Sequence, residues 1–497
     1  MSHGHAALGV STPQSRFYDT GRFGRLFPAL PPFASDIPII RDALAELGSV
    51  KGLMDADDDL SDPITLITDP AKSENNPNNP TLTAGMTFLG QFIDHDMTFD
   101  PTSSLARQQD PESIRNFRIP ALDLDSLYGG GPTSAPHLYD HTVDHGQTTM
   151  LTEEIPASGT VSIGGRVRFD LPRNGQNIAL TGDPRNDENL IVSQLHLALL
   201  RFHNKVLDDL RADLGQGYTL GELFAEAQRV VRWHYQWIVI HEYLTKTVGQ
   251  ATVDDILNNG PKHYDWRNDP FIPVEFSVAA YRFGHSQVRP SYRANFGTSA
   301  TDPHQQFFGL IFDPTLPDDN DPADLRGGKR AARRFIDWQT FFDFGDGRAK
   351  PNKAIDTTLS STLFQLMGLP QNEPISLATR NLLRNLTMKV PSGQCVARAM
   401  GLPVLAPADL ADLSSFRLQH RTPLWFYILR EAQVTTGGQH LGPVGGRIVA
   451  EVIIGLIQGD PHSYLRQDCD WEPTYGLNGS FVMADLLNVA DVVATLP

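Results

Sequence analysis

The chain has 497 residues, of which 40% are hydrophobic and 20% are charged, and its formal net charge is −17. This composition is typical of a soluble globular protein and argues against wholesale disorder. The negative charge disfavours binding to nucleic acid or anionic lipid, because both would be repelled. Only two cysteines are present, Cys395 and Cys469, which are too few for a disulfide framework.

The start of the chain is polar, and we expect residues 1–20 to form a flexible segment ahead of a single domain over residues 21–497. Residues 1–10 (MSHGHAALGV) have neither the basic region nor the apolar stretch of a secretory signal peptide. The longest apolar stretch, residues 448–457, is short and contains Glu451, so we expect no membrane span. The expected location is therefore the cytoplasm, or outside the cell by a route that needs no signal peptide. No pattern indicates an oligomeric state.

Helical periodicity dominates the sequence. Apolar residues recur with helical spacing in three long stretches, residues 189–214, 220–248 and 441–457. Alternating strand patterns are few and short. Turn chemistry predicts three loops, residues 69–80, 129–136 and 313–328, and none of them resembles an interdomain linker. The sequence therefore predicts a mainly α fold, a single large helical domain with few short strands.

Residues 87–98 (TFLGQFIDHDMT) have the pattern of a helix. Gln91 and His95 are four residues apart, so both lie on one face, and Asp94 and Asp96 flank the histidine. On these residues alone, a packed histidine is a better explanation of the segment than catalysis, and the Asp-His-Asp triplet could equally bind a metal or cap a turn. Peroxide cleavage would need such a base, together with a cation for the charge that develops as the O–O bond breaks.

A candidate for this cation lies in residues 181–189 (TGDPRNDEN). Asp183 and Pro184 have the form of an N-cap and a first helical residue. Arg185 and Glu188 would then share a helix face. By itself, the segment is an ordinary helix start.

Residues 279–290 (AAYRFGHSQVRP) place His285 behind a glycine, which would let a large flat group approach the backbone closely. An imidazole that binds iron needs one available nitrogen, while its other nitrogen is oriented by an acceptor. The amide oxygen of Asn381, in residues 380–385 (RNLLRN), is a candidate acceptor.

Two arginines lie beside these positions: Arg282 precedes His285 by three residues, and Arg384 follows Asn381 by three. The guanidinium fork matches carboxylates with two parallel hydrogen bonds. Both arginines are therefore candidate partners for the propionates of a haem.

Four segments in this order, GQFIDHD, GDPRNDE, YRFGH and RNLLR, resemble the signature of the animal-type haem peroxidases of the peroxidase–cyclooxygenase superfamily. Together they are highly specific. FGRLFPALPPF near the start, and PLWFYILREA with LGPVGGRIVAEVIIGLI near the end, are similar to bacterial members of the family. The resemblance covers nearly the whole chain and implies one mainly α domain.

The resemblance implies a haem peroxidase that reduces hydrogen peroxide through an iron–oxo intermediate. Its small-molecule or halide donors would include iodide, thiocyanate, bromide and phenols. His95 would be the distal acid–base, Gln91 its neighbour that positions water and halide, and Arg185 the distal cation. His285 would bind the haem iron, and Asn381 would orient it.

The resemblance also implies that the haem, derived from haem b, is ester-linked. Asp94 and Glu188 match the two carboxylates that form ester bonds to haem methyl groups in many relatives. The most strongly oxidising relatives have a methionine after the second of these, joined to the haem as a sulfonium, where this chain has Asn189. We therefore expect little oxidation of chloride.

A structural calcium is a further implication. Its side-chain ligands would be Asp96 and, in residues 122–129 (LDLDSLYG), Asp123 and Asp125. Carboxylate and carbonyl oxygens suit this hard cation. Ile119 stands where relatives carry a ligating threonine, so one side-chain ligand is missing.

Two alternatives remain at this stage. Fatty-acid dioxygenases of the superfamily carry a radical-forming tyrosine three residues before the proximal histidine, but Arg282 occupies that position and Tyr281 is one residue too early. Some relatives instead pair the fold with adhesion or interaction, for which Gln91, His95 and Arg185 would not be needed. Peroxidase activity is the favoured prediction.

Overall fold

The computed structural model describes residues 21–496 apart from residues 101–104, 107–109, 112–113, 143–145, 215–216, 268–269, 370 and 372. The flexible segment predicted for residues 1–20 lies outside the described residues. Helices dominate the described part of the chain, which confirms the prediction of a mainly α fold. None of these helices is long and apolar enough to cross a membrane.

Sixteen α-helices are found in the described residues. They are α1 (Pro38–Leu47), α2 (Thr65–Thr68), α3 (Gly85–Met97), α4 (Asp125–Tyr128), α5 (Gly131–Ser134), α6 (Leu190–Leu214), α7 (Leu220–Ile238), α8 (Thr245–Val248), α9 (Gln250–Asn259), α10 (Val274–Ser277), α11 (Leu377–Thr387), α12 (Gly393–Ala399), α13 (Leu424–Thr436), α14 (Pro443–Gly459), α15 (Tyr464–Gln467) and α16 (Met483–Val489).

The strands are short and form two-stranded sheets. The pairs are β1 (Phe23–Gly24) with β5 (Ile272–Pro273), which is parallel, and three antiparallel pairs, β2 (Asn78–Thr83) with β8 (Pro351–Lys353), β3 (Glu153–Glu154) with β4 (Phe169–Asp170), and β6 (Ser291–Asn295) with β7 (Phe307–Leu310). These pairs join segments around the helices and form no extended sheet.

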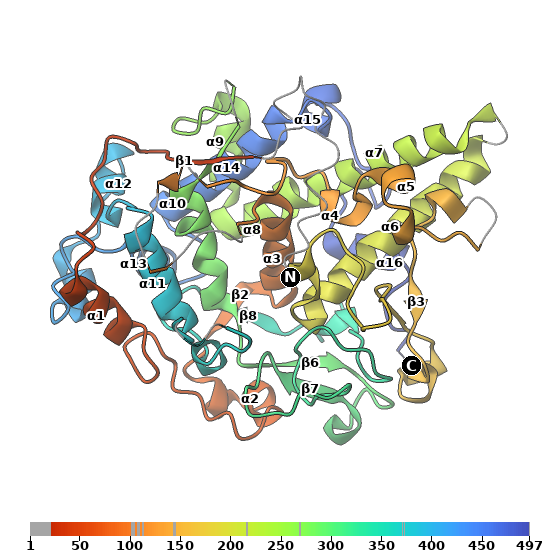
Figure 1. Ribbon diagram of the computed structural model, residues 1–497, viewed down its shortest axis with the longest axis horizontal. Helices are drawn as coiled ribbons and strands as arrows, with labels where there is room; N and C mark the ends of the chain where they lie inside the picture. The colour runs from red at the N-terminus through yellow and green to blue at the C-terminus, as the bar shows by residue number, and fades with distance from the viewer. Residues whose placement is uncertain are drawn as a thin grey trace.

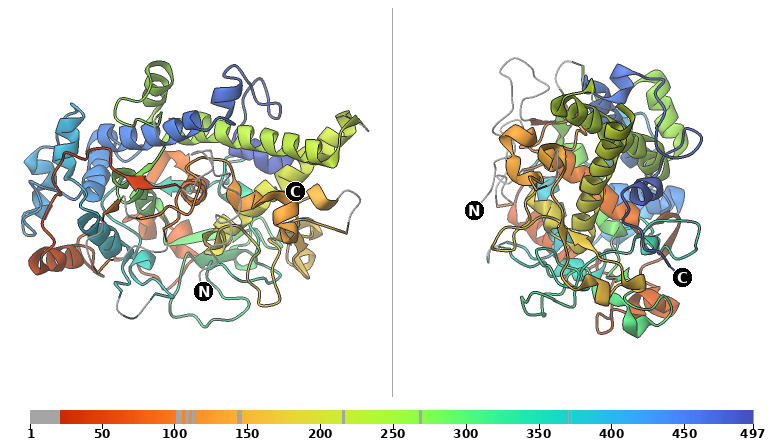
Figure 2. Two further views of the ribbon diagram at one scale, coloured as in Figure 1. Left: turned by 45° about the horizontal axis from the view of Figure 1, so that its top comes forward. Right: turned by 90° about the vertical axis from the view of Figure 1, so that its right-hand side faces the viewer.

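The three long periodic stretches form helices. The first and third correspond to α6 and α14, and the second is interrupted by a π-helix, Val239–Leu244, between α7 and α8. A capping box between Thr219 and Glu222 begins α7. Helices α6 and α7 pack side by side as a long pair in both figures (Figures 1 and 2).

The predicted loops were correct only in part. Residues 69–80 include a 3₁₀ turn, Pro70–Ser73, and the start of β2, while residues 129–136 contain α5. Polar side chains concealed this strand, because its pairing with β8 comes from backbone hydrogen bonds.

Helix α3 lies in the middle of the molecule (Figure 1) and contacts α6 and two 3₁₀ segments, Pro184–Asp187 and Ala280–Gln287. All of its residues are buried except Gln91 and Asp94. A helix that is apolar on nearly every side has to be enclosed by other elements. The central position of α3 thus brings the segments that carry the predicted site residues together.

Candidate active site

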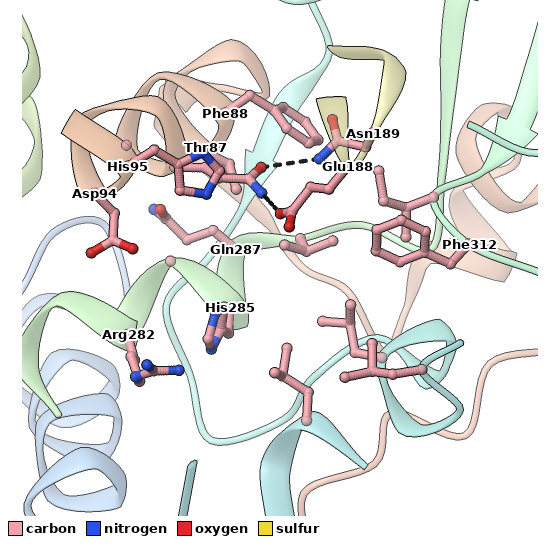
Figure 3. Close-up of a pocket in the computed structure, with 18 of the residues that line it drawn as sticks. Thr87, Phe88, Asp94, His95, Glu188, Asn189, Arg282, His285, Gln287 and Phe312 are labelled. Atoms are coloured by element: carbon pink, nitrogen blue, oxygen red, sulfur yellow. Dashed lines mark hydrogen bonds between the residues drawn. The ribbon is translucent and has the colours of Figure 1, made fainter. Parts of the chain in front are cut away.

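A cavity of about 570 Å³ lies between α3, residues 187–189 just before α6, and the 3₁₀ segment Ala280–Gln287. His95 projects into it from one wall and His285 from the opposite wall (Figure 3). The cavity is lined by six of the predicted site residues, Gln91, Asp94, His95, Glu188, Arg282 and His285. Much of the remaining wall is apolar, with Ile311, Phe312, Leu363, Leu366, Met367, Leu369 and Leu377.

His95 is held in one orientation by an amide. Its Nδ1 lies 2.8 Å from Oδ1 of Asn186, in the 3₁₀ segment Pro184–Asp187. Because an amide oxygen only accepts, Nδ1 donates to it and Nε2 keeps its lone pair. Burial lowers the pKa of His95 to about 3, so the ring is neutral near pH 7. A neutral imidazole with a free Nε2 is the form that acts as a base.

The carboxylates of the cavity wall are also fixed by neighbours. Gln91 donates from Nε2 to Glu188 and accepts at Oε1 from Nδ2 of Asn189, 3.2 Å away (Figure 3). Desolvation is the main cause that raises the pKa of Glu188, to about 7, and it also raises the pKa of Asp94. The two carboxyl groups therefore hold protons more readily than they would in water.

The opposite wall differs from the prediction in one detail. Asn381, in α11, lies beside His285 as expected, but its Nδ2 faces Nδ1 of the imidazole, at 2.8 Å. The amide oxygen accepts instead from Nη1 of Arg282, at 3.1 Å, because a guanidinium can only donate. The predicted acceptor role toward His285 would require the amide to turn. Burial lowers the pKa of His285 to about 3, so this ring is also neutral.

Arg185 and Arg384 are not among the cavity-lining residues of the described chain. The guanidinium of Arg185 donates to Asp183 and to the backbone oxygens of His95 and Thr98. It lies 3.9 Å from the carboxylate of Asp94 and so reaches the cavity only through that residue. The N-cap carboxylate of Asp183, which is fully buried, explains why the arginine turns away.

The sequence reasoning assigned no role to four residues that lie in the cavity or beside it. Asn186, which orients His95, belongs to the same GDPRNDE segment as Arg185, so its position was the available signal. Gln287 lines the cavity with an amide nitrogen that has no partner in the described structure. Tyr243 and Tyr281 line it too, and their ring centroids are 6.4 Å apart. No spacing in the sequence pairs these two tyrosines.

The three predicted calcium ligands come together. Carboxylate oxygens of Asp96, Asp123 and Asp125 lie within 4.8 Å of one another. Asp96 is buried, and its Oδ1 has no hydrogen-bond partner in the described structure. Asp125 also forms an ion pair with Arg118, at 2.8 Å. An unpartnered buried carboxylate oxygen beside two further carboxylates fits a hard divalent cation.

The chain is similar to known peroxidases. Residues 108–320 match the model of the animal haem peroxidase family. Human thyroid peroxidase is 32% identical over 406 residues, which are 66% of this chain and 41% of that protein. Chorion peroxidase of Drosophila melanogaster is 25% identical over 384 residues, which are 71% of this chain and 44% of that protein. The chain thus spans less than half the length of these relatives.

Solved structures share the fold. Peroxidase A from Dictyostelium discoideum matches with a TM-score of 0.59 and 17% identity, over 96% of this chain and 95% of that chain. A fatty acid alpha-dioxygenase from Oryza sativa matches with a TM-score of 0.55 and 15% identity, over 88% of this chain and 78% of that chain.

The fold is thus the mainly α fold of these solved structures, and it places two histidines on opposite walls of one cavity. Residues 108–320 of the chain match an animal haem peroxidase domain, and the relatives named above are peroxidases.

Proposed function

We propose that the protein reduces hydrogen peroxide with a bound haem while it oxidises small donors. The placement of His95 and His285 on opposite walls of one cavity supports this most directly (Figure 3). The cavity also fits a flat, largely apolar group. A Cβ built on Gly284, which lines the cavity, would meet no atom within 4 Å, so a planar ring has room beside the backbone.

In this proposal His285 holds the iron, and Arg282, which lines the same wall, meets a propionate. Haem, when bound, supplies the iron centre at which the O–O bond is cleaved. When Arg282 binds the propionate, it releases the side-chain oxygen of Asn381. The Asn381 amide is then free to turn, so that this oxygen accepts from Nδ1 of His285. Such an acceptor leaves Nε2 free to bind the metal.

His95 performs the proton transfer. Its Nε2 takes a proton from one peroxide oxygen and gives it to the other oxygen, which leaves as water. Asn186 keeps the ring in the required tautomer throughout. Gln91, fixed between Glu188 and Asn189, orients the entering peroxide or halide. Arg185, which contacts the cavity residue Asp94, stabilises the negative charge that develops as the O–O bond breaks.

Asn189 supports a restricted range of donors. Its side-chain oxygen accepts from the backbone N–H groups of Ile191 and Val192 and so caps the start of α6, while its nitrogen bonds Gln91. Asparagine cannot form the sulfonium link described above. Without a positive sulfur beside the macrocycle, the haem is a weaker oxidant, because the surrounding groups set its potential. Donors that are easily oxidised should still react.

A donor panel tests the proposal. With hydrogen peroxide, we expect oxidation of guaiacol, iodide, thiocyanate and bromide, and little chlorination at neutral pH. Halogenation of monochlorodimedone, measured with each halide separately, reports the difference. Chlorination as fast as bromination would contradict the role given to Asn189.

The same protein also tests the two alternative functions. Oxygen uptake with linoleate, in place of peroxide turnover, would favour the dioxygenase alternative. A haem-bearing protein without either activity would favour an interaction role.

Ester links between the haem and the cavity carboxylates are a second testable part of the proposal. After peroxide treatment, the wild type is expected to keep its haem through acid–acetone extraction. The double variant Asp94→Val, Glu188→Gln should release the haem. Both of these side chains line the cavity, and neither replacement has a carboxylate that could form the ester. Mass spectrometry of the peptides identifies the linked residues. Recovery of only unmodified haem from the treated wild type would show that no ester forms.

Calcium is proposed for the carboxylate cluster. Adding Ca²⁺ to chelator-treated protein should raise its melting temperature. At a calcium concentration 100 times the Kd, the gain in free energy of unfolding is about 2.7 kcal/mol. Asp123→Asn should remove most of this gain, whereas Asp319→Asn, on an exposed loop, should leave it unchanged. Equal melting temperatures with and without calcium in the wild type would refute the site.

A further inference from the structure

A second cavity, of about 960 Å³, shares no lining residue with the first in the described part of the chain. It is bordered by α7 with the following π-helix, and by α9, α14 and α15, which Figure 1 shows together along the upper edge of the molecule. Three tryptophans line it, Trp237, Trp266 and Trp471. We refer to it as the indole groove. Its volume is within the range of small-molecule sites.

Aromatic rings form one part of the indole groove. The rings of Trp237 and Trp471 are 6.0 Å apart at an angle of 76°, and Tyr464 lies within 5.8 Å of both. His241 stacks on Trp237 at 3.8 Å. Both tryptophans are only half-buried, so each leaves ring surface exposed. Such rings favour an aromatic ligand, because offset and edge-to-face contacts stabilise ring pairs beyond the buried area.

Two cations form another part. The guanidinium groups of Arg267 and Arg466 lie 4.9 and 5.8 Å from the ring centre of Trp266. Both arginines are exposed, and within the described residues neither guanidinium has an ion-pair partner, although the backbone N–H of Arg267 donates to the carboxylate of Asp265. Asp470 and Glu472 also line the groove, but beyond ion-pair distance of either arginine. Two unpaired guanidiniums beside one indole, in a chain of net charge −17, favour a bound carboxylate.

From these observations we infer that the indole groove binds an aromatic carboxylate. Its ring lies against Trp237 and Trp471, and its carboxylate lies between Arg267 and Arg466. The site is separate from the haem cavity, so it goes beyond the proposed peroxidase function and does not depend on it.

The test uses the haem-loaded protein and two probes, 2-naphthoate and its uncharged counterpart 2-naphthamide, in calorimetric titrations. We expect naphthoate to bind at least about tenfold more tightly, since charge-assisted hydrogen bonds are roughly twice as strong as neutral ones. The double variant Arg267→Gln, Arg466→Gln should remove this preference. Trp471→Leu should weaken both probes. Arg398→Gln, at an exposed position in α12, is the matched control and should bind as the wild type does.

Three outcomes would overturn the inference. They are equal affinities of the wild type for the two probes, unchanged naphthoate affinity in the double arginine variant, and a change in the haem absorption spectrum on binding, which would place the probe in the haem cavity. The arginine variants change exposed side chains, so they test the inference even if Trp471→Leu fails to fold. No peroxide turnover is measured, so failure here leaves the proposed peroxidase function untouched.

Discussion

Replacement of His285 by alanine is expected to leave a folded protein that no longer holds haem stably. His285 is the histidine on the wall formed by the 3₁₀ segment Ala280–Gln287, and its neutral ring faces the cavity. Losing the protein ligand of the iron should weaken haem binding by on the order of 100-fold, or about 2.7 kcal/mol. Spectroscopic titration of the haem-free protein with haem measures this loss.

Two controls separate the loss of a ligand from misfolding. Added imidazole can occupy the space left in His285→Gly, so it should restore a ferric haem spectrum in that variant. His137→Ala, which changes an exposed histidine far along the chain, should bind haem as the wild type does. A normal high-affinity ferric spectrum in His285→Ala, without imidazole, would refute the assignment.

Periodicity could predict the long helices because their apolar faces meet the core. The π-helix Val239–Leu244 has no such signal, because it continues the helical pattern on both sides. Its register change matters locally: His241 lines the indole groove, while Tyr243 lines the haem cavity. A search for apolar residues with a period of 3.6 gives no sign of the single extra residue that a π-helix inserts into an α-helix.

The site was predictable as a set of residues but not as a set of orientations. Motifs identified His95, His285 and Asn381, and the structure brings each to the cavity or beside it. The directions of Arg185 and of the Asn381 amide depend on Asp183 and Arg282, which are partners chosen by three-dimensional packing. Competing hydrogen bonds of this kind leave no trace in residue spacing.

The indole groove was even less predictable from the sequence than the haem cavity. Its tryptophans and arginines come from three parts of the chain that are far apart in sequence: α7, the segment between α9 and β5, and α15 with the residues that follow it. Each residue alone is an ordinary surface or core position. Only their convergence, with two guanidiniums on Trp266, indicates a ligand.

Replacement of His95 by alanine should retain haem yet slow its reaction with hydrogen peroxide by about 10²- to 10⁴-fold, the usual contribution of a positioned acid–base group. Stopped-flow absorbance at the main haem band measures the second-order rate constant. The orientation of the ring gives a second, sharper test. Asn186→Leu removes the acceptor opposite Nδ1, so the proton is free to move to Nε2 and the base is lost in part.

The conservative variant Asn186→Asp distinguishes orientation from general damage. A carboxylate still accepts from Nδ1 of His95, so we expect Asn186→Asp to react much faster than Asn186→Leu, with both variants retaining haem. Equal rates in these two variants would show that Asn186 does not act through the tautomer. An unchanged rate constant in His95→Ala would exclude the histidine as the base. The proton would then have to move through another group, and Gln287, whose amide nitrogen is unpartnered in the described cavity, cannot accept it at that atom.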